Sequence, residues 1–176
     1  QQADFNHILY QESPDAACVL SMAGDVLAWS PGCERVFGFR AEEMLGHRYA
    51  DHFVPVDQAD DFAHRWQQMV EHGHAEFEAV RRRRDGSLLF VDVSCRRVPL
   101  ADEATWVVAM AEKDVTPIKV ERDAKLMEER FRDLLESTPD GIVMANATGH
   151  IVIANSQAES LFGYSAGQLR GVLVDQ

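Results

Sequence analysis

A stretch near the start of this chain recurs near its end, displaced by 125 residues, the distance from Pro14 to Pro139. The first copy reads SPDAACVLSMAGDVLAWSPGCERVFGF and the second reads TPDGIVMANATGHIVIANSQAESLFGY. Further identities in this register are Asp15 with Asp140, Gly24 with Gly149, Phe37 with Phe162, Gly38 with Gly163 and Gly46 with Gly171. A repeat of this length is a whole folding unit and not a solenoid turn, so we expect two related domains.

Each copy begins with the pattern of a β-hairpin followed by short helices. In the first copy, apolar runs on either side of a glycine turn predict strands at 17–22 and 25–29. Helices are expected to follow at 32–37 and 41–45, with Gly46 closing the second one. The second copy repeats the hairpin pattern and stops soon afterwards.

Only the first copy continues. Residues 58–72 predict an amphipathic helix, which ends at Gly73 and has one apolar face made of Phe62, Trp66, Met69 and Val70. An Asp-Gly pair then predicts a tight hairpin between strands at 75–84 and 88–100, and a last strand is expected at 105–113. This order predicts an α+β fold with one five-stranded antiparallel sheet and helices on one face.

The stretch from Asp114 to Glu136 predicts a long helix between the two copies. Thr116 is a suitable N-cap and Pro117 suits the first helical position. Apolar residues spaced by four, three, four and three form a narrow seam: Val120, Ala124, Met127, Phe131 and Leu134. The seam favours pairing with another helix, and the alternative is packing on the helix's own domain.

Charge and composition exclude several classes of partner. Across 176 residues, 17 Lys and Arg face 29 Asp and Glu, a net charge of −12, so broad nucleic-acid binding and direct contact with an anionic membrane are not expected. No apolar run approaches the roughly 18 residues of a membrane span, and the N-terminus lacks the pattern of a signal peptide. Three widely spaced cysteines, Cys18, Cys33 and Cys95, favour reduced thiols and a cytoplasmic location.

Five motifs in this order resemble the PAS family of sensory domains. They are the strand–glycine–strand opening, the VFGF of the first copy, the second copy with Asn155, the RRRRDGS hairpin and Asp114-Val115-Thr116. The first copy departs from the pattern in having Ser30 where Asn155 stands. The resemblance implies a first PAS domain at 1–116, a linker helix at 117–136 and a partial second PAS unit at 137–176.

The partial second unit lacks the long helix and three strands of the first. A two-stranded hairpin is marginal alone. We therefore expect the second unit to pack on the first domain or on a partner chain.

The resemblance also implies a small ligand between the sheet and the long helix. The candidate ligand-binding residues are Trp29, Phe62, Trp66, Met69 and Val91. An internal cavity of a few hundred cubic ångströms would favour sensing, whereas a core filled by Trp29, Phe62 and Trp66 would favour a scaffold.

Motifs for a coloured cofactor or a metal are not found. Cys33 lies outside any match to the flavin photochemistry motif and is expected to be a buried or capping thiol. The position of the haem ligand falls on Phe62, and His64 lies on the wet face of the helix. His72 and His74 flank one glycine and lack a third ligand, so a polar turn is expected.

Arg81 to Arg84 form a single basic run. As part of a strand, their side chains would alternate between the two faces. We expect solvated side chains or surface ion pairs, and the alternative is an inward arginine that binds a carboxylate ligand.

No motif of catalysis is present, so this part of the chain is not expected to be an enzyme. The resemblance implies the sensory input region of a bacterial signalling protein, a sensor histidine kinase being favoured over a diguanylate cyclase. Asp114, Thr116, Met127 and Phe131 would relay the signal, in a homodimer paired through the linker helix and joined to a downstream domain. The alternatives are a ligand-free dimerisation scaffold and a flavin- or haem-binding redox or light sensor.

Overall fold

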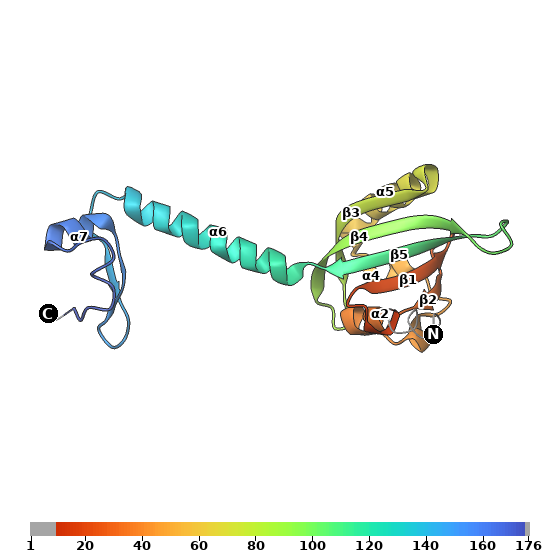
Figure 1. Ribbon diagram of the computed structural model, residues 1–176, viewed down its shortest axis with the longest axis horizontal. Coiled ribbons are helices and arrows are strands. Elements are labelled where there is room, and N and C mark those ends of the chain that lie inside the picture. Colours follow the sequence, from red (N-terminus) through yellow and green to blue (C-terminus); the bar gives the residue numbers. More distant parts are fainter. Residues whose placement is uncertain (1–9, 175–176) are drawn as a thin grey trace. The chain divides into compact units, whose positions relative to one another are not determined.

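The computed structural model describes residues 10–174, and the chain divides at Lys119 and Val120 into two compact units (Figure 1). Residues 1–9 of the expected first domain and 175–176 of the expected second unit lie outside the described residues. The division falls within the predicted linker helix.

The first unit is an α+β domain. Its five strands form one sheet in the order β2-β1-β5-β4-β3, and each neighbouring pair is antiparallel. The predicted five-stranded sheet with helices is confirmed. The elements are β1 (Ala16–Ser21), β2 (Val26–Trp29), α2 (Pro31–Phe37), α3 (Ala41–Met44), α4 (Tyr49–Phe53), η1 (Val56–Gln58), α5 (Ala59–His72), β3 (His74–Arg82), β4 (Leu88–Pro99) and β5 (Trp106–Asp114).

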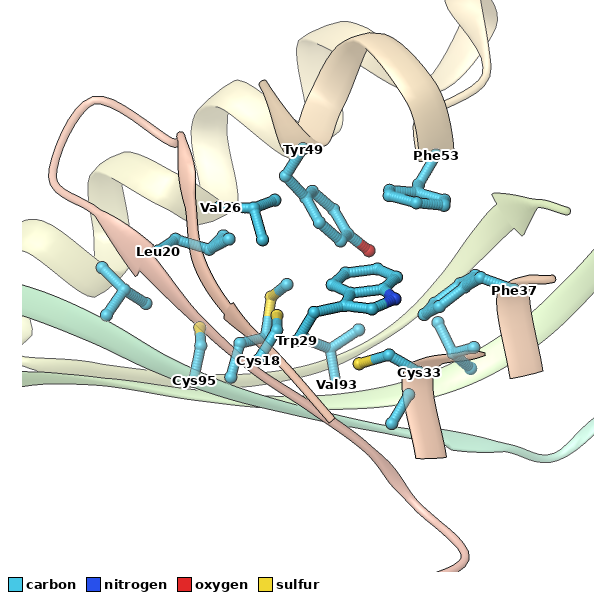
Figure 2. Close-up of a cluster of buried hydrophobic side chains, with 14 of the residues drawn as sticks. Cys18, Leu20, Val26, Trp29, Cys33, Phe37, Tyr49, Phe53, Val93 and Cys95 are labelled. Atoms are coloured by element: carbon cyan, nitrogen blue, oxygen red, sulfur yellow. The ribbon is translucent and has the colours of Figure 1, made fainter. Parts of the chain in front are cut away.

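The core lies between one face of the sheet and the helices. In β4 every second residue from Leu89 to Cys95 is buried and the residues between them are exposed, as the two-residue period of a strand requires. Helix α5 packs on β3 and β4, and α2 packs on β1. The buried side chains of this layer meet in the cluster drawn in Figure 2.

The helices of the first unit follow the sequence pattern except at α4 and at the short 3₁₀ helix η1. Helix α5 begins one residue after the predicted start and ends where Gly73 takes a positive φ of 83°, which a glycine adopts without strain. Helix α4 was not predicted, because five residues are too few to show a helical period. It nevertheless delivers Tyr49 and Phe53 to the core, both fully buried.

The hairpin between β3 and β4 begins earlier than predicted. Strand β3 ends at Arg82, and the N–H of Arg83 donates to the carbonyl of Ser87 across the turn. Gly86 has a positive φ of 84° in this turn. Arg83 and Arg84 therefore leave the strand, and the alternation of a strand does not set the direction of their side chains.

The predicted linker helix is α6 (Thr116–Ser137). The prediction that Thr116 is its N-cap is wrong, because Thr116 is already helical and the carbonyl of Val115 accepts from the N–H of Lys119. The hydroxyl of Thr116 instead accepts from the N–H of Phe90 in β4 at 2.8 Å. Tertiary contact with the neighbouring strand has replaced local capping.

The second unit contains the rest of α6 and a small α+β element. Its parts are β6 (Val143–Ala145), β7 (Ile151–Ala154) and α7 (Ser156–Phe162), with β6 and β7 forming a two-stranded antiparallel sheet. Ile151, Ala158 and Leu169 form its small buried cluster. The N–H of Ile151 donates to the carbonyl of Val172, so the segment after α7 lies along β7. Packing on the first domain or on a partner chain stays a prediction.

Candidate functional site

Aromatic rings fill the space between the sheet and helices α2 and α4. The ring centroid of Phe53 lies 5.2 Å from that of Trp29, 4.7 Å from that of Phe37 and 5.0 Å from that of Tyr49 (Figure 2). All four side chains are buried. Trp29, a predicted ligand-binding residue, is thus part of a packed core, and its indole N–H donates to the carbonyl of Phe39.

The other predicted ligand-binding residues lie on both sides of this core. Met69 of α5 and Val91 of β4 are fully buried. Phe62 and Trp66 of α5 are half-buried, with ring centroids 5.8 Å apart. These two rings line a cavity of about 220 Å³, whose other walls are Ala23, Gly24, Arg48, Ala50 and Ala63. The structure therefore places Phe62 and Trp66 at a cavity and Trp29 away from it.

A buried ion pair occupies the centre of the first unit. Nε of Arg81 donates to Oε1 of Glu112 and to the hydroxyl of Tyr49, both at 2.9 Å. The hydroxyl of Tyr49 donates in turn to Oε2 of Glu112 at 2.6 Å. The side chains of Arg81 and Glu112 are each 1% exposed.

The prediction of a solvated side chain or a surface ion pair is therefore wrong for Arg81. Position 81 falls on the inward face of β3, where an arginine requires a buried partner. That partner, Glu112, lies on β5 and carries no local sequence signal. The sequence did not predict the triad of Arg81, Glu112 and Tyr49. The one available signal was an acidic residue at an inward-facing position of the last strand.

The environment fixes the protonation of the triad. Burial raises the pKa of the Tyr49 hydroxyl well above its ordinary value, so this group stays a neutral donor. Burial lowers the pKa of Arg81, but its hydrogen bonds to Tyr49 and Glu112 and the negative charge of Glu112 outweigh this effect, and the pKa stands above its ordinary range. Arg81 is therefore a permanent cation within the core.

One end of Arg81 is not used by this network. Nη1 donates to the carbonyl of Val80 at 3.1 Å, whereas Nη2 is buried and has no hydrogen-bond partner among the described residues. The guanidinium carbon lies 5.5 Å from the ring centroid of Phe62, the half-buried ring at the cavity.

The remaining arginines of the run contact the helices around the core. Arg83 donates from Nε to the carbonyl of Val36 in α2 at 3.1 Å. Arg84 forms an ion pair with Glu43 of α3 at 2.9 Å, and both side chains are partly exposed. The expectation of a surface ion pair is confirmed for Arg84.

The base of α6 is bonded to the sheet and to the hairpin. Oδ1 of Asp114 accepts from the N–H of Thr116 at 2.9 Å, and Oδ2 forms an ion pair with Arg83 at 2.7 Å. Thr116 is held to Phe90 of β4 as described above. Two of the predicted relay residues, Asp114 and Thr116, thus lie together at this junction.

The other two predicted relay residues lie on the surface of α6. Met127 is 66% exposed and Phe131 is 47% exposed, and they are flanked on the same seam by the exposed Val120 and Leu134. No residue of α6 is buried, although the whole helix is described. Pairing of this seam with another helix, and the alternative that it packs on its own domain, both stay predictions.

Asn155 joins the end of α6 to the residues that follow it in the second unit. Its Oδ1 accepts from the N–H groups of Ile142 and Ala158, and its Nδ2 donates to the carbonyls of Leu135 and Asp140. Its side chain is fully buried with all four bonds made. Ser30, its counterpart in the first unit, accepts from the N–H groups of Ala17 and Cys33 and so reproduces only the acceptor half.

The residues weighed as cofactor or metal ligands do not form a set of ligands in the part of the chain that the structure describes. His64, His72 and His74 are exposed, and Cys33 is buried with its thiol donating to the carbonyl of Ala17 at 3.2 Å. Within residues 10–174, no three His, Cys, Asp or Glu side chains gather as a set of metal ligands. Among the helices of this described range, none has both the length and the apolar character needed to cross a membrane.

Family comparisons agree with this architecture. A model described as the PAS fold matches residues 10–113, and one described as the PAS domain matches residues 129–176. Because the first match spans more than half of the chain, the chain belongs to the PAS family, whose domains are generally sensory. Curated proteins give no significant match.

Solved structures of PAS domains share the fold. One from a protein of Colwellia psychrerythraea has a TM-score of 0.59 and 17% identity, covering 66% of this chain and 99% of its own. A PAS domain from a two-component sensor histidine kinase has a TM-score of 0.54 and 16% identity, covering 64% and 96%. A domain of a sensory box sensor histidine kinase/response regulator from Geobacter sulfurreducens has a TM-score of 0.51 and 19% identity, covering 64% and 94%.

Proposed function

We propose that this chain is the sensory input region of a bacterial signal-transduction protein, with a sensor histidine kinase as the favoured output. In this proposal the first PAS domain (1–116) detects a small ligand, and α6 carries the change toward the second unit and a downstream domain. The three buried free cysteines support a reducing, cytoplasmic location.

The junction of β5 and α6 carries the proposal. Asp114 and Thr116 bond the first turn of α6 to Arg83 and Phe90. The start of the helix is therefore fixed to the sheet, which forms one wall of the core. A displacement of the core layer would therefore be transmitted to the direction of α6. A ligand can bias such a change only through different affinities for the two arrangements.

A second copy of the chain is the proposed partner of α6. Exposed apolar residues spaced by four and three are the pattern that pairs helices, and the exposed Met127 and Phe131 lie at its centre. Helix α6 carries five basic and six acidic side chains, a balance of −1, whereas the whole chain carries −12. Because the helix is nearly neutral, two copies that pair through it would meet little net charge repulsion.

A cysteine crosslink tests this pairing. Met127→Cys should form a disulfide between two chains under oxidising conditions, because the seam brings this position against its copy. Lys125→Cys is the matched control, since it is exposed on the same helix but lies about 200° around the axis from position 127. Absence of the Met127→Cys crosslink together with a light-scattering mass of one chain would remove the dimeric relay.

The filled aromatic core favours a second candidate, a ligand-free dimerisation scaffold. Trp29, one of the predicted ligand-binding residues, packs against Phe37 and Phe53, away from the cavity at Phe62 and Trp66. Native mass spectrometry of the freshly purified chain separates the two functions: a dimer with a bound small molecule supports sensing, and a bare dimer supports the scaffold. A visible absorption band would favour the flavin or haem alternative instead.

A further inference from the structure

Two buried thiols of the first unit lie where β1 meets α2. Cys18 is in β1 and Cys33 is in the first turn of α2, and they are 5% and 0% exposed. The thiol of Cys33 donates to the carbonyl of Ala17 at 3.2 Å, and this carbonyl belongs to the peptide group that leads into Cys18. The thiol of Cys18 is hydrogen-bonded to that of Cys33. Both side chains belong to the core cluster drawn in Figure 2.

The second unit has the same local arrangement without sulfur. The repeat places Val143 opposite Cys18 and Ala158 opposite Cys33. The N–H of Ala158 donates to the side chain of its helix N-cap at 3.0 Å, and the N–H of Cys33 does the same at 3.2 Å. A strand and a helix of this kind therefore meet without any thiol, so the two thiols of the first unit are available for a chemical role.

The two thiols differ in acidity. The hydrogen bond with Cys18 lowers the pKa of Cys33 below its ordinary value, although burial opposes this effect. The same hydrogen bond, together with burial, raises the pKa of Cys18 well above its ordinary value. Because the thiolate is the form that attacks an oxidant, Cys33 is the thiol that reacts first and Cys18 is the thiol that then joins it.

We propose that Cys18 and Cys33 form a reversible disulfide when a peroxide reaches them, which makes the first unit a thiol redox switch. This inference goes beyond the proposed ligand sensing, because its signal is an oxidant and it requires no bound molecule. In a reducing compartment, disulfides of this kind are usually transient and redox-sensing.

The reaction consumes one peroxide and two thiols. The thiolate of Cys33 attacks one oxygen of the peroxide and the O–O bond breaks, which leaves a sulfenic acid on Cys33 and a hydroxide that takes up the proton given up by Cys33. The sulfur of Cys18 then attacks the sulfenic sulfur, the S–S bond forms, and the proton of Cys18 leaves with the hydroxyl group as water. Two electrons pass from the two thiols to the peroxide, and a thiol reductant reverses the change.

Helix α2 connects this pair to the base of α6. An S–S bond of about 2.05 Å is shorter than any hydrogen bond between two thiols, so oxidation draws the first turn of α2 toward β1. Near the other end of α2, the carbonyl of Val36 accepts from Arg83, which also forms the ion pair with Asp114. A displacement of this seven-residue helix therefore reaches the ion pair that holds the base of α6.

Cys95 is an internal control for the pairing. It lies on β4, and Met110 of β5 is opposite both Cys95 and Cys18. Two strand spacings, roughly 9.5 Å, therefore separate the backbones at Cys18 and Cys95, which exceeds the roughly 7 Å that a disulfide can bridge. Oxidation should link Cys18 to Cys33 and leave Cys95 free.

Oxidation of the full chain with hydrogen peroxide tests the switch. After reduction and removal of the reductant, the chain should lose two hydrogen atoms per molecule in intact mass spectrometry. Digestion without reductant should yield peptides joined through Cys18 and Cys33, and dithiothreitol should restore the original mass. Cys95→Ser should behave as the native chain. Cys33→Ala and Cys18→Val, which introduce the residues found in the second unit, should each form no disulfide within the chain.

Hydrogen exchange at residues 116–119 then measures whether the disulfide acts as a switch. Exchange there should change on oxidation of the native chain and stay constant in Cys33→Ala under the same treatment. The proposal is overturned if no linked peptides form, if the disulfide includes Cys95, or if dithiothreitol does not reverse it. A disulfide that leaves exchange at 116–119 unchanged would also overturn the switch.

Discussion

The guanidinium of Arg83 and the carboxylate of Asp114 lie 2.7 Å apart, which bonds the turn after β3 to the residue before α6. The same guanidinium donates to the carbonyl of Val36 at 3.1 Å. One side chain therefore fixes the end of α2 and the base of α6 relative to each other.

Arg83→Met should loosen the base of α6. The ion pair is about one-quarter exposed, so its loss should lower the free energy of unfolding of the first unit by only about 1 kcal/mol. Amide exchange at residues 116–119 should accelerate more than elsewhere in that unit, as measured by hydrogen-exchange mass spectrometry. Arg96→Met, on the exposed face of β4, is the control. Equal exchange at 116–119 in both variants would contradict a holding role for Arg83.

Arg81 and Glu112 should be strongly coupled. Arg81→Met leaves a buried carboxylate without its cation and should cost about 3–5 kcal/mol of stability. The double variant Arg81→Met with Glu112→Gln should lose clearly less, because glutamine is neutral and still accepts from Tyr49. Urea unfolding followed by tryptophan fluorescence measures both, since Trp29, Trp66 and Trp106 all lie in the first unit. Additive losses would show that the pair is not coupled.

Tyr49 should make the first unit less stable at alkaline pH. Burial holds its pKa well above the ordinary 10.0, while Arg81 lowers that pKa and Glu112 and Cys18 add to the increase. Above pH 10 the unfolded chain loses this proton and the folded chain keeps it, so the free energy of unfolding falls as pH rises, by up to about 1.4 kcal/mol per pH unit.

Unfolding in urea between pH 9 and 11 measures this dependence. Tyr49→Phe should lower stability at neutral pH, because Glu112 loses a donor, and should flatten the alkaline decline. Tyr164→Phe, in the second unit, should leave the first unit's profile as in the native chain. Parallel declines in the native chain and in Tyr49→Phe would assign the effect to another group.

Asn155→Ser should loosen the end of α6 from the rest of the second unit. Serine keeps the acceptor for Ile142 and Ala158, as Ser30 does in the first unit, but it cannot supply both donors to Leu135 and Asp140. Two part-buried hydrogen bonds would be lost, at roughly 0.5–1.5 kcal/mol each. Amide exchange at 135–142 should rise accordingly. Asn146→Ala, which disturbs only the β6–β7 turn, should not have this effect.

Local pattern was sufficient for most of the fold. The helical period and Gly73 predicted α5 to within a residue, and the Asp-Gly pair predicted the β3–β4 hairpin. The sequence also predicted the apolar seam of α6, and the side chains of this seam are exposed in the structure. These features depend on the backbone preferences of single residues and on apolar side chains at a fixed spacing. Both can be recognised within a short stretch of sequence.

Partners distant in the chain were decided only by the tertiary structure. Arg81 and Glu112 are 31 residues apart and Tyr49 and Glu112 are 63 apart, so no periodicity indicated that they would meet. Thr116 matched every local rule for a helix cap, yet its hydroxyl bonds to Phe90 because the adjacent strand offers a backbone donor. By itself the sequence determined the strands and the longer helices and which of their faces are apolar. Which polar groups pair inside the core depended on how strands and helices were brought together, because a buried charge is stable only where packing supplies its counterpart.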